Sequence, residues 1–187
     1  VVVVRPIDHK DYLGGASIVA LHAKSFVNDV HLYSLSGNDS LSNFLNDELD
    51  KNDITSIIYL DDSRPTTLKT RYKINSRSVF RTNVLSVNDI SLNMQKKVMK
   101  DIENSINNNN INLVIFSDFN YGFISKKLIN SITKLCQKKQ IMVCADSQTS
   151  SQVGNLIKYH DISLLTPTEH ELRTAANDFD SGIPVVS

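Results

Sequence analysis

The second half of the chain alternates short apolar runs with amphipathic segments, and this alternation limits the folds it can adopt. The runs INLVIF, IMVCA and ISLLT are separated by SKKLINSITKLCQKKQ and by a short helical turn around NLIKY. A last segment, TEHELRTAAND, indicates a further helix. Apolar strands that alternate with helices are typical of a parallel sheet covered on both faces. The sequence therefore predicts an α/β fold.

The first half contains similar elements and one stretch of a different kind. Residues 54–85 hold three β-branched, alternating runs separated by turn-forming residues, which predicts a small antiparallel ribbon. The other expected elements are helices over 14–27, 39–53 and 89–108 and a strand over 29–37. We expect one domain over residues 1–187, a parallel-sheet αβα sandwich with an antiparallel ribbon inserted near 54–85.

Composition argues against several classes of protein. The 187 residues are 41% hydrophobic, which is enough for one domain with a core. Twenty basic residues balance twenty acidic ones, so no basic excess indicates nucleic acid or an anionic membrane as a partner. No apolar run approaches the roughly 20 residues of a membrane-spanning helix. Cys136 and Cys144 lack the spacing of a metal site or a disulfide framework, so we expect reduced thiols and a cytoplasmic protein.

Polar side chains follow three of the expected strands. They are Ser117, Asp118, Asn120 and Tyr121 after the first, Asp146, Ser147, Gln148 and Thr149 after the second, and Thr166, Thr168, Glu169 and Glu171 after the third. If the strands are parallel, these clusters share the edge where such sheets bind ligands. Each cluster alone also fits a helix cap, because caps favour Asp, Ser and Thr. Three together favour a polyhydroxy or phosphate ligand, and composition does not separate these two.

The expected ribbon carries six cations among β-branched and aromatic residues. They are Arg64, Lys69, Arg71, Lys73, Arg77 and Arg81. The period of two along a strand puts Lys69, Arg71 and Lys73 on one face. One interpretation is a solvated face. The other is a face turned to an anionic sugar phosphate, for which the planar fork of arginine is suited, with the bulky face covering the cleft or a second subunit.

Several well-known motifs are missing from the sequence. It contains neither G-x-x-x-x-G-K-[ST] nor a G-x-G-x-x-G segment after a strand, which argues against a P-loop enzyme and leaves a dinucleotide site unsupported. No serine lies in G-x-S-x-G. The stretch Glu169-His170-Glu171 lacks the histidine pair of a zinc helix. His22 and His31 have no neighbouring ligands, and we interpret both as structural or surface residues.

One ordered set of segments resembles a known family. LGGASIVALHA, SLSGND, RPTTLKTRY, VFRTN, VIFSDFNYG and LLTPTEHE occur in the order seen in ribokinase-like (PfkB-type) carbohydrate kinases. Within that family the chain is most similar to the bacterial heptose-phosphate kinases of the ADP-heptose pathway, over nearly all 187 residues. The resemblance implies a β-lid and phosphorylation of a sugar or sugar phosphate that depends on ATP and Mg²⁺. It also implies a possible homodimer paired through the lids.

The resemblance also implies roles for individual residues. Gly14 and Gly15 would let the backbone approach the sugar, Lys69, Arg71 and Arg81 would face its hydroxyls or phosphate, and Asp118 and Asn120 would lie near the phosphate in transfer. On the nucleotide side the implied residues are Asp146, Ser147, Gln148, Thr168 and Glu171, with Glu171 acting on Mg²⁺ through water.

The chain departs from the family pattern at several positions. Thr168 replaces the family's Asn, Ser147-Gln148 stands where heptose kinases have Pro-Lys, and Ile18-Val19 stands where relatives have Asn-Val. The family's early Gly-Asp strand and its Gly-Ala-Gly-Asp segment, which supplies the general base and the anion-binding helix terminus, are not among these residues.

We therefore expect a parent protein with kinase activity that requires C-terminal residues outside these 187, and a fragment that is inactive alone. One alternative is a non-catalytic sugar-binding or dimerisation module, or a degenerate kinase. A further alternative, an unrelated α/β enzyme such as a nucleotide-sugar transferase, leaves the motif of the expected lid unexplained.

Overall fold

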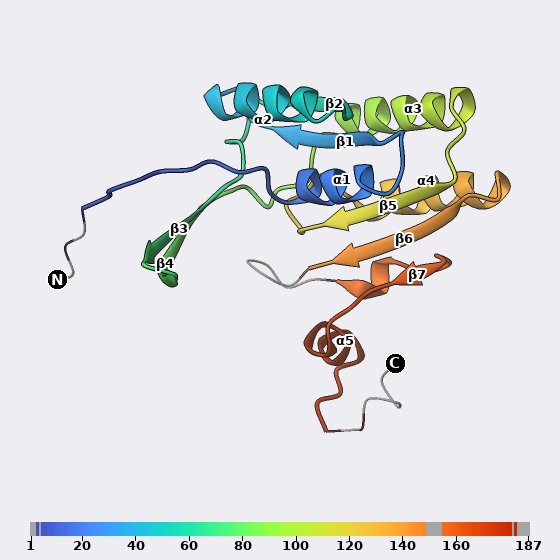
Figure 1. The fold of residues 1–187 in the computed structure, drawn as a ribbon. Helices are drawn as coiled ribbons and strands as arrows, with labels where there is room; N and C mark the ends of the chain where they lie inside the picture. The colour runs from blue at the N-terminus through green and yellow to red at the C-terminus, as the bar shows by residue number, and fades with distance from the viewer. Residues whose placement is uncertain (1–2, 4, 149–154, 181, 183–187) are drawn as a thin grey trace.

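Parallel strands in two groups form the centre of the computed structural model, which describes residues 3, 5–148, 155–180 and 182. The first group pairs β1 (His31–Ser36) with β2 (Thr55–Leu60), and the second orders β5 (Leu113–Asp118), β6 (Met142–Ser147) and β7 (Leu164–Leu165). An antiparallel hairpin of β3 (Leu68–Ile74) and β4 (Arg77–Val84) projects from this body (Figure 1). The predicted α/β fold with an inserted antiparallel hairpin is confirmed.

The helices α2 to α5 begin at polar residues whose side chains bind their first backbone N–H groups. Their bounds are α1 Ala16–Lys24, α2 Ser40–Lys51, α3 Leu92–Asn108, α4 Lys126–Lys138 and α5 Glu169–Ala176, with a short 3₁₀ turn, η1, at Leu156–Lys158. Asp39 caps α2, Ser91 caps α3, Ser125 caps α4 and Thr168 caps α5, each through its side-chain oxygen. These residue types are the preferred caps, so the sequence itself fixes where these helices start.

The helices lie on two sides of the strands. A core cluster that includes Val98, Phe116, Ile129, Ile132 and Val143 joins α3 and α4 to one face. A second cluster, of Ala20, Leu32, Leu49 and Ile54, joins α1 and α2 to the other face of β1 and β2. Figure 1 shows α1 across the space between β1 and β5, and it contacts both strands.

The β2 segment corrects one prediction from the sequence. Residues 54–60 were expected to begin the antiparallel ribbon, but Thr55–Leu60 pairs with β1 in parallel, from His31 opposite Thr55 to Ser36 opposite Leu60. The ribbon near 54–85 is therefore smaller, a two-stranded hairpin over 68–84. Alternating β-branched residues fit either setting, because this pattern reports a strand and not the direction of its partner.

Within the described residues, one face of the second group of strands is covered less completely than the other, although α1 contacts β5. The side chains of Leu113, Ile115, Met142 and Leu164 are 43%, 42%, 56% and 53% exposed. Pairing places Ile115 opposite Cys144 and Cys144 opposite Leu164, so these apolar side chains lie on one face. Parallel strands usually have helices on both faces.

Two further expectations concern the cysteines and membranes. Cys136 lies buried in α4 and Cys144 lies on β6, and both are free thiols, as predicted. Burial raises the pKa of the Cys136 thiol to about 11. Across the described part of the chain, none of the helices combines the length and the apolarity that crossing a bilayer requires.

Candidate functional site

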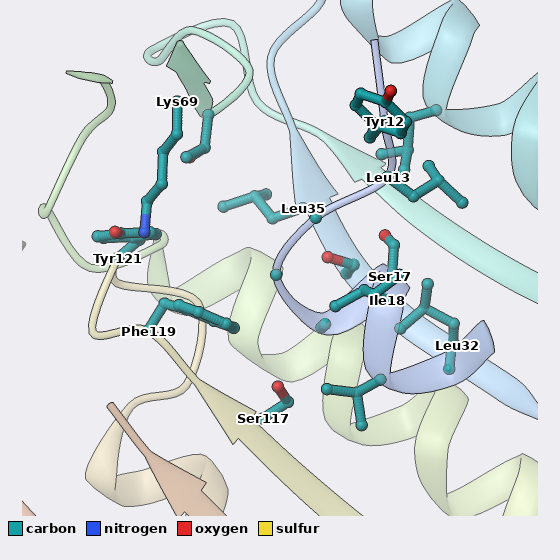
Figure 2. Close-up of a pocket in the computed structure, with 18 of the residues that line it drawn as sticks. Tyr12, Leu13, Ser17, Ile18, Leu32, Leu35, Lys69, Ser117, Phe119 and Tyr121 are labelled. Atoms are coloured by element: carbon teal, nitrogen blue, oxygen red, sulfur yellow. The ribbon is translucent and has the colours of Figure 1, made fainter. Parts of the chain in front are cut away.

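A cavity of about 2450 Å³ extends from the hairpin to α1 and to the edges of β1 and β5. Its mouth lies at the carboxyl end of β5, where Gly14, Gly15, Lys69, Phe119 and Tyr121 line it. In Figure 2, Lys69 reaches from the hairpin to Tyr121, and Phe119 lies beneath it, opposite the start of α1. The cavity therefore lies at the edge of the sheet where the sequence predicted a ligand.

Asp118 ends β5 and is held by three polar groups. Its side chain is 3% exposed. One oxygen, Oδ1, accepts a hydrogen bond from the Asn120 backbone N–H at 2.8 Å. The other, Oδ2, accepts from the Tyr159 hydroxyl at 2.7 Å and forms an ion pair with Lys158. A carboxylate engaged in this way orients its neighbours and is poorly placed to accept a proton from a substrate.

Asn120 joins the ends of β5 and β6. Its amide Nδ2 donates to Ser147 Oγ at 3.4 Å and to the Gln148 carbonyl at 3.2 Å, while its Oδ1 accepts from Lys158 Nζ at 3.0 Å. The backbone has φ 58°, a left-handed conformation that asparagine tolerates better than most residues. Asn120 thus links the carboxyl ends of β5 and β6, residues 117–122 and 146–148, which we call the rim.

Lys158 is the last residue of η1 and Tyr159 follows it, and no sequence pattern predicted their contact with Asp118. The Lys158 side chain is 12% exposed and Tyr159 is 6% exposed. Burial raises the pKa of the Tyr159 hydroxyl far above its usual value, and the charge of Asp118 adds to the effect. Tyr159 therefore stays protonated and serves as a hydrogen-bond donor to Asp118.

Lys69 connects the hairpin to the rim. Its Nζ lies 5.2 Å from the ring centroid of Phe119 and 5.2 Å from that of Tyr121, whose rings lie 6.1 Å apart. A cation within about 6 Å of an aromatic centroid is attracted to the ring face. The hairpin therefore turns its lysine face toward the cavity mouth.

Arg71 and Arg81 lie directly opposite each other in the hairpin ladder and both line the cavity. Both residues are exposed. Residues opposite each other in an antiparallel pair project to the same face, so both arginines share the face of Lys69. Like charges in this arrangement are destabilising by roughly 0.2–1 kcal/mol, which an anion placed between them would relieve.

The base of the hairpin is fixed by Arg64, whose side chain is 5% exposed. It donates from Nε to Asp61 Oδ2 at 2.7 Å, and its two terminal nitrogens donate to the Tyr121 carbonyl at 3.1 Å and to the Asn88 carbonyl at 2.9 Å. Asn88 follows the hairpin and Tyr121 belongs to the rim. One guanidinium thus holds both ends of the hairpin against the rim.

Two glycines allow close backbone contacts where the base of the hairpin meets the rim. A Cβ at Gly37 would lie 2.5 Å from the Arg64 carbonyl oxygen, and a Cβ at Gly122, with φ 80°, would lie 1.9 Å from that of Asn88. Gly15, with φ 56°, precedes α1, and a Cβ added there would lie 3.6 Å from the Phe119 ring. Gly14 has open space around it. The Gly14-Gly15 pair therefore brings backbone to the cavity wall.

The residues expected on the nucleotide side lie at the same edge but do not line the cavity, apart from Gln148. Ser147 is buried, and the Gln148 side-chain amide donates to Asp146 at 3.0 Å. Thr168 and Glu171 form a capping box, in which Glu171 Oε2 accepts from both the backbone N–H and the hydroxyl of Thr168 at 2.8 Å. Thr149 lies outside the described residues.

The described residues do not offer a direct magnesium site. No group of three or more His, Cys, Asp or Glu side chains among them could hold a metal ion. Glu171 is 7% exposed and already accepts two hydrogen bonds from Thr168. Carboxylates and water are the usual ligands of Mg²⁺. The donor set seen here does not fit a metal bound directly by protein side chains.

The predicted residues fall into three overlapping sets. Those that line the cavity are Lys69, Arg71, Arg81, Asp118, Gln148 and the glycine pair. Asn120, Asp118, Ser147 and Gln148 form the network at the strand ends, where Gln148 also binds Asp146, and Thr168 and Glu171 cap α5. Arg64 and Lys158 reach the strand ends through contacts that are distant in the sequence. Arg64 binds carbonyls 24 and 57 positions away, and Lys158 binds side chains 38 and 40 positions away. No short motif could have identified them.

Among curated proteins, the chain is similar to several that carry the same name. The chain is 28% identical over 176 residues to the "Bifunctional protein HldE" of Aliarcobacter butzleri, covering 94% of this chain and 36% of that protein. It is 30% identical over 164 residues to the protein of that name from Helicobacter pylori, covering 87% and 34%. The chain therefore spans about a third of the length of these relatives.

Solved structures support the fold. Phosphofructokinase-2 from Escherichia coli, in a tetrameric inhibited form, superposes with a TM-score of 0.67 at 13% identity, covering 92% of this chain and 55% of that one. Ribokinase from Giardia lamblia gives 0.61 at 14% identity, covering 93% and 59%. A family model described as "pfkB family carbohydrate kinase" matches residues 2–185. The chain therefore belongs to the pfkB family of carbohydrate kinases.

Proposed function

We propose that the protein containing these residues transfers a phosphoryl group from ATP to a sugar or sugar phosphate, with a substrate similar to heptose phosphate. Membership of the family supports a carbohydrate acceptor. The departure at Ile18-Val19 lies where relatives contact the sugar, so the acceptor can differ from that of the relatives.

The observation that carries this proposal is the position of the hairpin cations. Lys69 lies against two aromatic rings at the cavity mouth, and Arg71 and Arg81 stand opposite each other on the same face. Guanidinium groups bind phosphate through paired hydrogen bonds. A sugar phosphate in the mouth would place its anionic group between the arginines and its ring beside Gly14-Gly15 and Phe119.

The rim residues would position the substrate and leave proton transfer to another group. Asp118 is 3% exposed, with both oxygens engaged, so we propose that it holds Asn120 and the β5–β6 rim in place. Bound ATP would supply the phosphoryl group. Phosphoryl transfer depends mainly on positioning and charge stabilisation, with a residue that orients or deprotonates the attacking hydroxyl. We propose that polypeptide outside these 187 residues supplies this base.

A second candidate is a sugar-binding or dimerisation module without turnover. The observation that favours it is the capping box at Thr168-Glu171, which engages the glutamate expected to act near Mg²⁺. Under this alternative the cavity and hairpin would bind sugar phosphate, and ATP would not be consumed.

ATP turnover by the longest natural protein that contains residues 1–187, assayed with a panel of sugar phosphates, separates the two candidates. Lys69→Ala and Arg71→Ala should each lower kcat/KM about 10–100-fold, the equivalent of one lost charge-assisted hydrogen bond of roughly 1.5–3 kcal/mol. Arg77→Ala at the exposed hairpin tip, outside the lining of the cavity, is the matched control and should change it less than about twofold. Sugar-phosphate binding without turnover would favour the second candidate.

Glu171 needs a variant that preserves the helix cap. Glu171→Gln retains the capping box, which accepts glutamine at this position, whereas Glu171→Ala removes it. If Glu171 acts near Mg²⁺ through water, both variants lose turnover. If the residue only caps α5, the glutamine variant keeps its turnover and its stability, and the alanine variant loses stability.

A further inference from the structure

The outer surfaces of α3 and α4 carry a local excess of positive charge. The chain as a whole has twenty basic and twenty acidic residues, but residues 90–100 and 119–145 contain neither aspartate nor glutamate. Eight exposed lysines lie in these two ranges: Lys96, Lys97, Lys100, Lys126, Lys127, Lys134, Lys138 and Lys139. The neutral net charge of the chain therefore does not describe this part of its surface.

The two helices contact each other and form one broad surface (Figure 1). The cap of α4 is Ser125, whose hydroxyl donates to Gln95 Oε1 near the start of α3 at 2.8 Å, so both helices begin at the same end. An α-helix with its side chains is about 10–12 Å across, so two helices side by side present a surface about 20 Å wide.

Five of the lysines point away from the strands. On α4, Lys127, Lys134 and Lys138 are seven and four residues apart, a spacing that puts them on one side of the helix. The buried residues of α4 occupy the opposite side: Leu128, Ile129, Ile132, Thr133 and Cys136. On α3, Lys96 and Lys100 likewise lie opposite the buried residues of that helix. We call these five lysines the basic face.

The protein itself does not neutralise the basic face. Among the described residues, none of the ion pairs includes one of its five lysines. Lys127 also lies in the first turn of α4, which has no acidic residue. The positive end of the helix dipole disfavours a cation there, so this charge costs stability instead of adding to it. A charge kept at such a cost points to an anionic partner.

The chemistry of the basic face separates the possible anionic partners. A surface about 20 Å wide does not enter the major groove of duplex DNA, which is about 12 Å wide. Single strands are usually bound by aromatic side chains on which bases stack, and α3 and α4 contain no Phe, Tyr or Trp. The chain also has no arginine between Arg81 and Arg173, and arginine is the residue that grips one phosphate with two hydrogen bonds. Lysines spread over a broad surface suit a partner with many separate charges.

We propose that the basic face binds the surface of an anionic lipid bilayer. Lipid phosphates form a plane of separate negative charges, and each lysine near such a plane strengthens binding about fivefold. Within the described residues no helix could cross the bilayer, so the contact is peripheral. None of the five lysines lines the cavity, and the proposal does not depend on the kinase reaction.

The charge on the other side of the strands favours the same orientation. There α2 carries Asp47, Glu48 and Asp50 against a single lysine, Lys51. An anionic bilayer repels this side and attracts the basic face, so the two helices α3 and α4 would lie next to the lipid and α2 away from it.

Cosedimentation with vesicles tests the proposal in the longest natural protein that contains residues 1–187. The vesicles contain about one part phosphatidylglycerol to two parts phosphatidylcholine, and pure phosphatidylcholine is the neutral comparison. Binding to the anionic vesicles should be at least about 100-fold tighter than to the neutral ones. It should be lost between about 0.1 M and about 1 M salt, over which the Debye length falls from about 10 Å to about 3 Å.

A pair of triple variants locates the contact. Replacing Lys127, Lys134 and Lys138 together by glutamine should weaken binding to anionic vesicles about 100-fold, at about fivefold for each lysine. Glutamine has a helix propensity close to that of lysine, so α4 should stay folded, which circular dichroism checks. The matched control removes the same charge from exposed positions elsewhere and should weaken binding less than about threefold: Lys10→Gln, Lys51→Gln and Arg77→Gln.

Equal losses in the two triple variants, or equal binding to neutral and anionic vesicles, would overturn the proposal. Duplex RNA or polyglutamate that displaces the protein from the vesicles at a lower charge concentration than that of the lipid would also overturn it. Those outcomes would assign the basic face to nucleic acid or to an acidic protein.

Discussion

Replacing Arg64 with alanine tests whether one buried guanidinium fixes the hairpin to the rim. The change removes hydrogen bonds to the Asn88 and Tyr121 carbonyls and leaves the Asp61 carboxylate without its cation. The pKa of Asp61 is held below its usual range by the Ser63 hydroxyl and by Arg64, so the lost interaction belongs to an ionised group.

The magnitude follows from these three contacts. Each buried carbonyl left unpaired costs about 1–3 kcal/mol, and breaking a buried ion pair costs about 3–5 kcal/mol. The Asp61 side chain is 14% exposed, so water can replace part of the loss. We expect Arg64→Ala to lower the free energy of unfolding by about 3 kcal/mol. Arg64→Lys should recover less than half of this, because an ammonium group lacks the planar fork.

Denaturant unfolding and hydrogen exchange measured by mass spectrometry provide the assay. Exchange should accelerate in residues 85–91 and 119–123, which meet at Arg64, and remain unchanged in α4. Arg77→Ala, at the exposed hairpin tip, is the matched control and should stay within about 0.5 kcal/mol of wild type. Equal stability of the Arg64 and Arg77 variants, or unchanged exchange at 119–123, would refute the idea that this side chain holds the hairpin.

Further predictions concern the glycine at the junction, the rim network, acid stability and the hairpin surface. Gly122→Ala should destabilise the protein by at least about 2 kcal/mol and Gly14→Ala by less than about 0.5 kcal/mol, because only the first meets backbone, at 1.9 Å. Lys158→Met should lower the free energy of unfolding by about 3–5 kcal/mol, because it leaves the buried Asp118 carboxylate without its cation. Adding Asp118→Asn should restore part of this loss. If the losses of the two single variants simply add in the double variant, Lys158 and Asp118 do not stabilise each other. The hydrogen bond from the Thr66 backbone N–H lowers the pKa of Asp39 below its usual value of 3.8, so the stabilisation from ionised Asp39 is complete above pH 3.8 and is lost as the pH falls further. The difference in free energy of unfolding between wild type and Asp39→Asn should therefore shrink below pH 3.8. A difference that stays constant with pH would contradict this prediction. If the hairpin pairs two subunits, Phe80→Asp on its 43%-exposed apolar face should abolish a dimer seen by sedimentation, whereas Arg77→Ala should not.

Much of the fold could be predicted from local pattern because local chemistry determines it. Ser91, Ser125 and Thr168 mark helix starts by their side-chain caps, and the alternation after residue 111 predicts the β5–β6–β7 group. The direction of β2 could not be predicted, because its β-branched residues suit a parallel strand and an antiparallel ribbon equally well. Which strands lie side by side is also invisible to local pattern, since it depends on contacts between residues far apart in the sequence.

The polar strand ends illustrate why a site is harder to predict than a sheet. A buried carboxylate or amide must first be satisfied by the protein itself, because leaving it unpaired costs more than most ligands return. Asp118, Asn120 and Glu171 are satisfied in this way by Lys158, Tyr159 and Thr168. On the hairpin face, by contrast, Arg71 and Arg81 stand opposite each other at a cost that an anion would remove. Substrate recognition should therefore depend more on the hairpin face than on the polar ends of the strands.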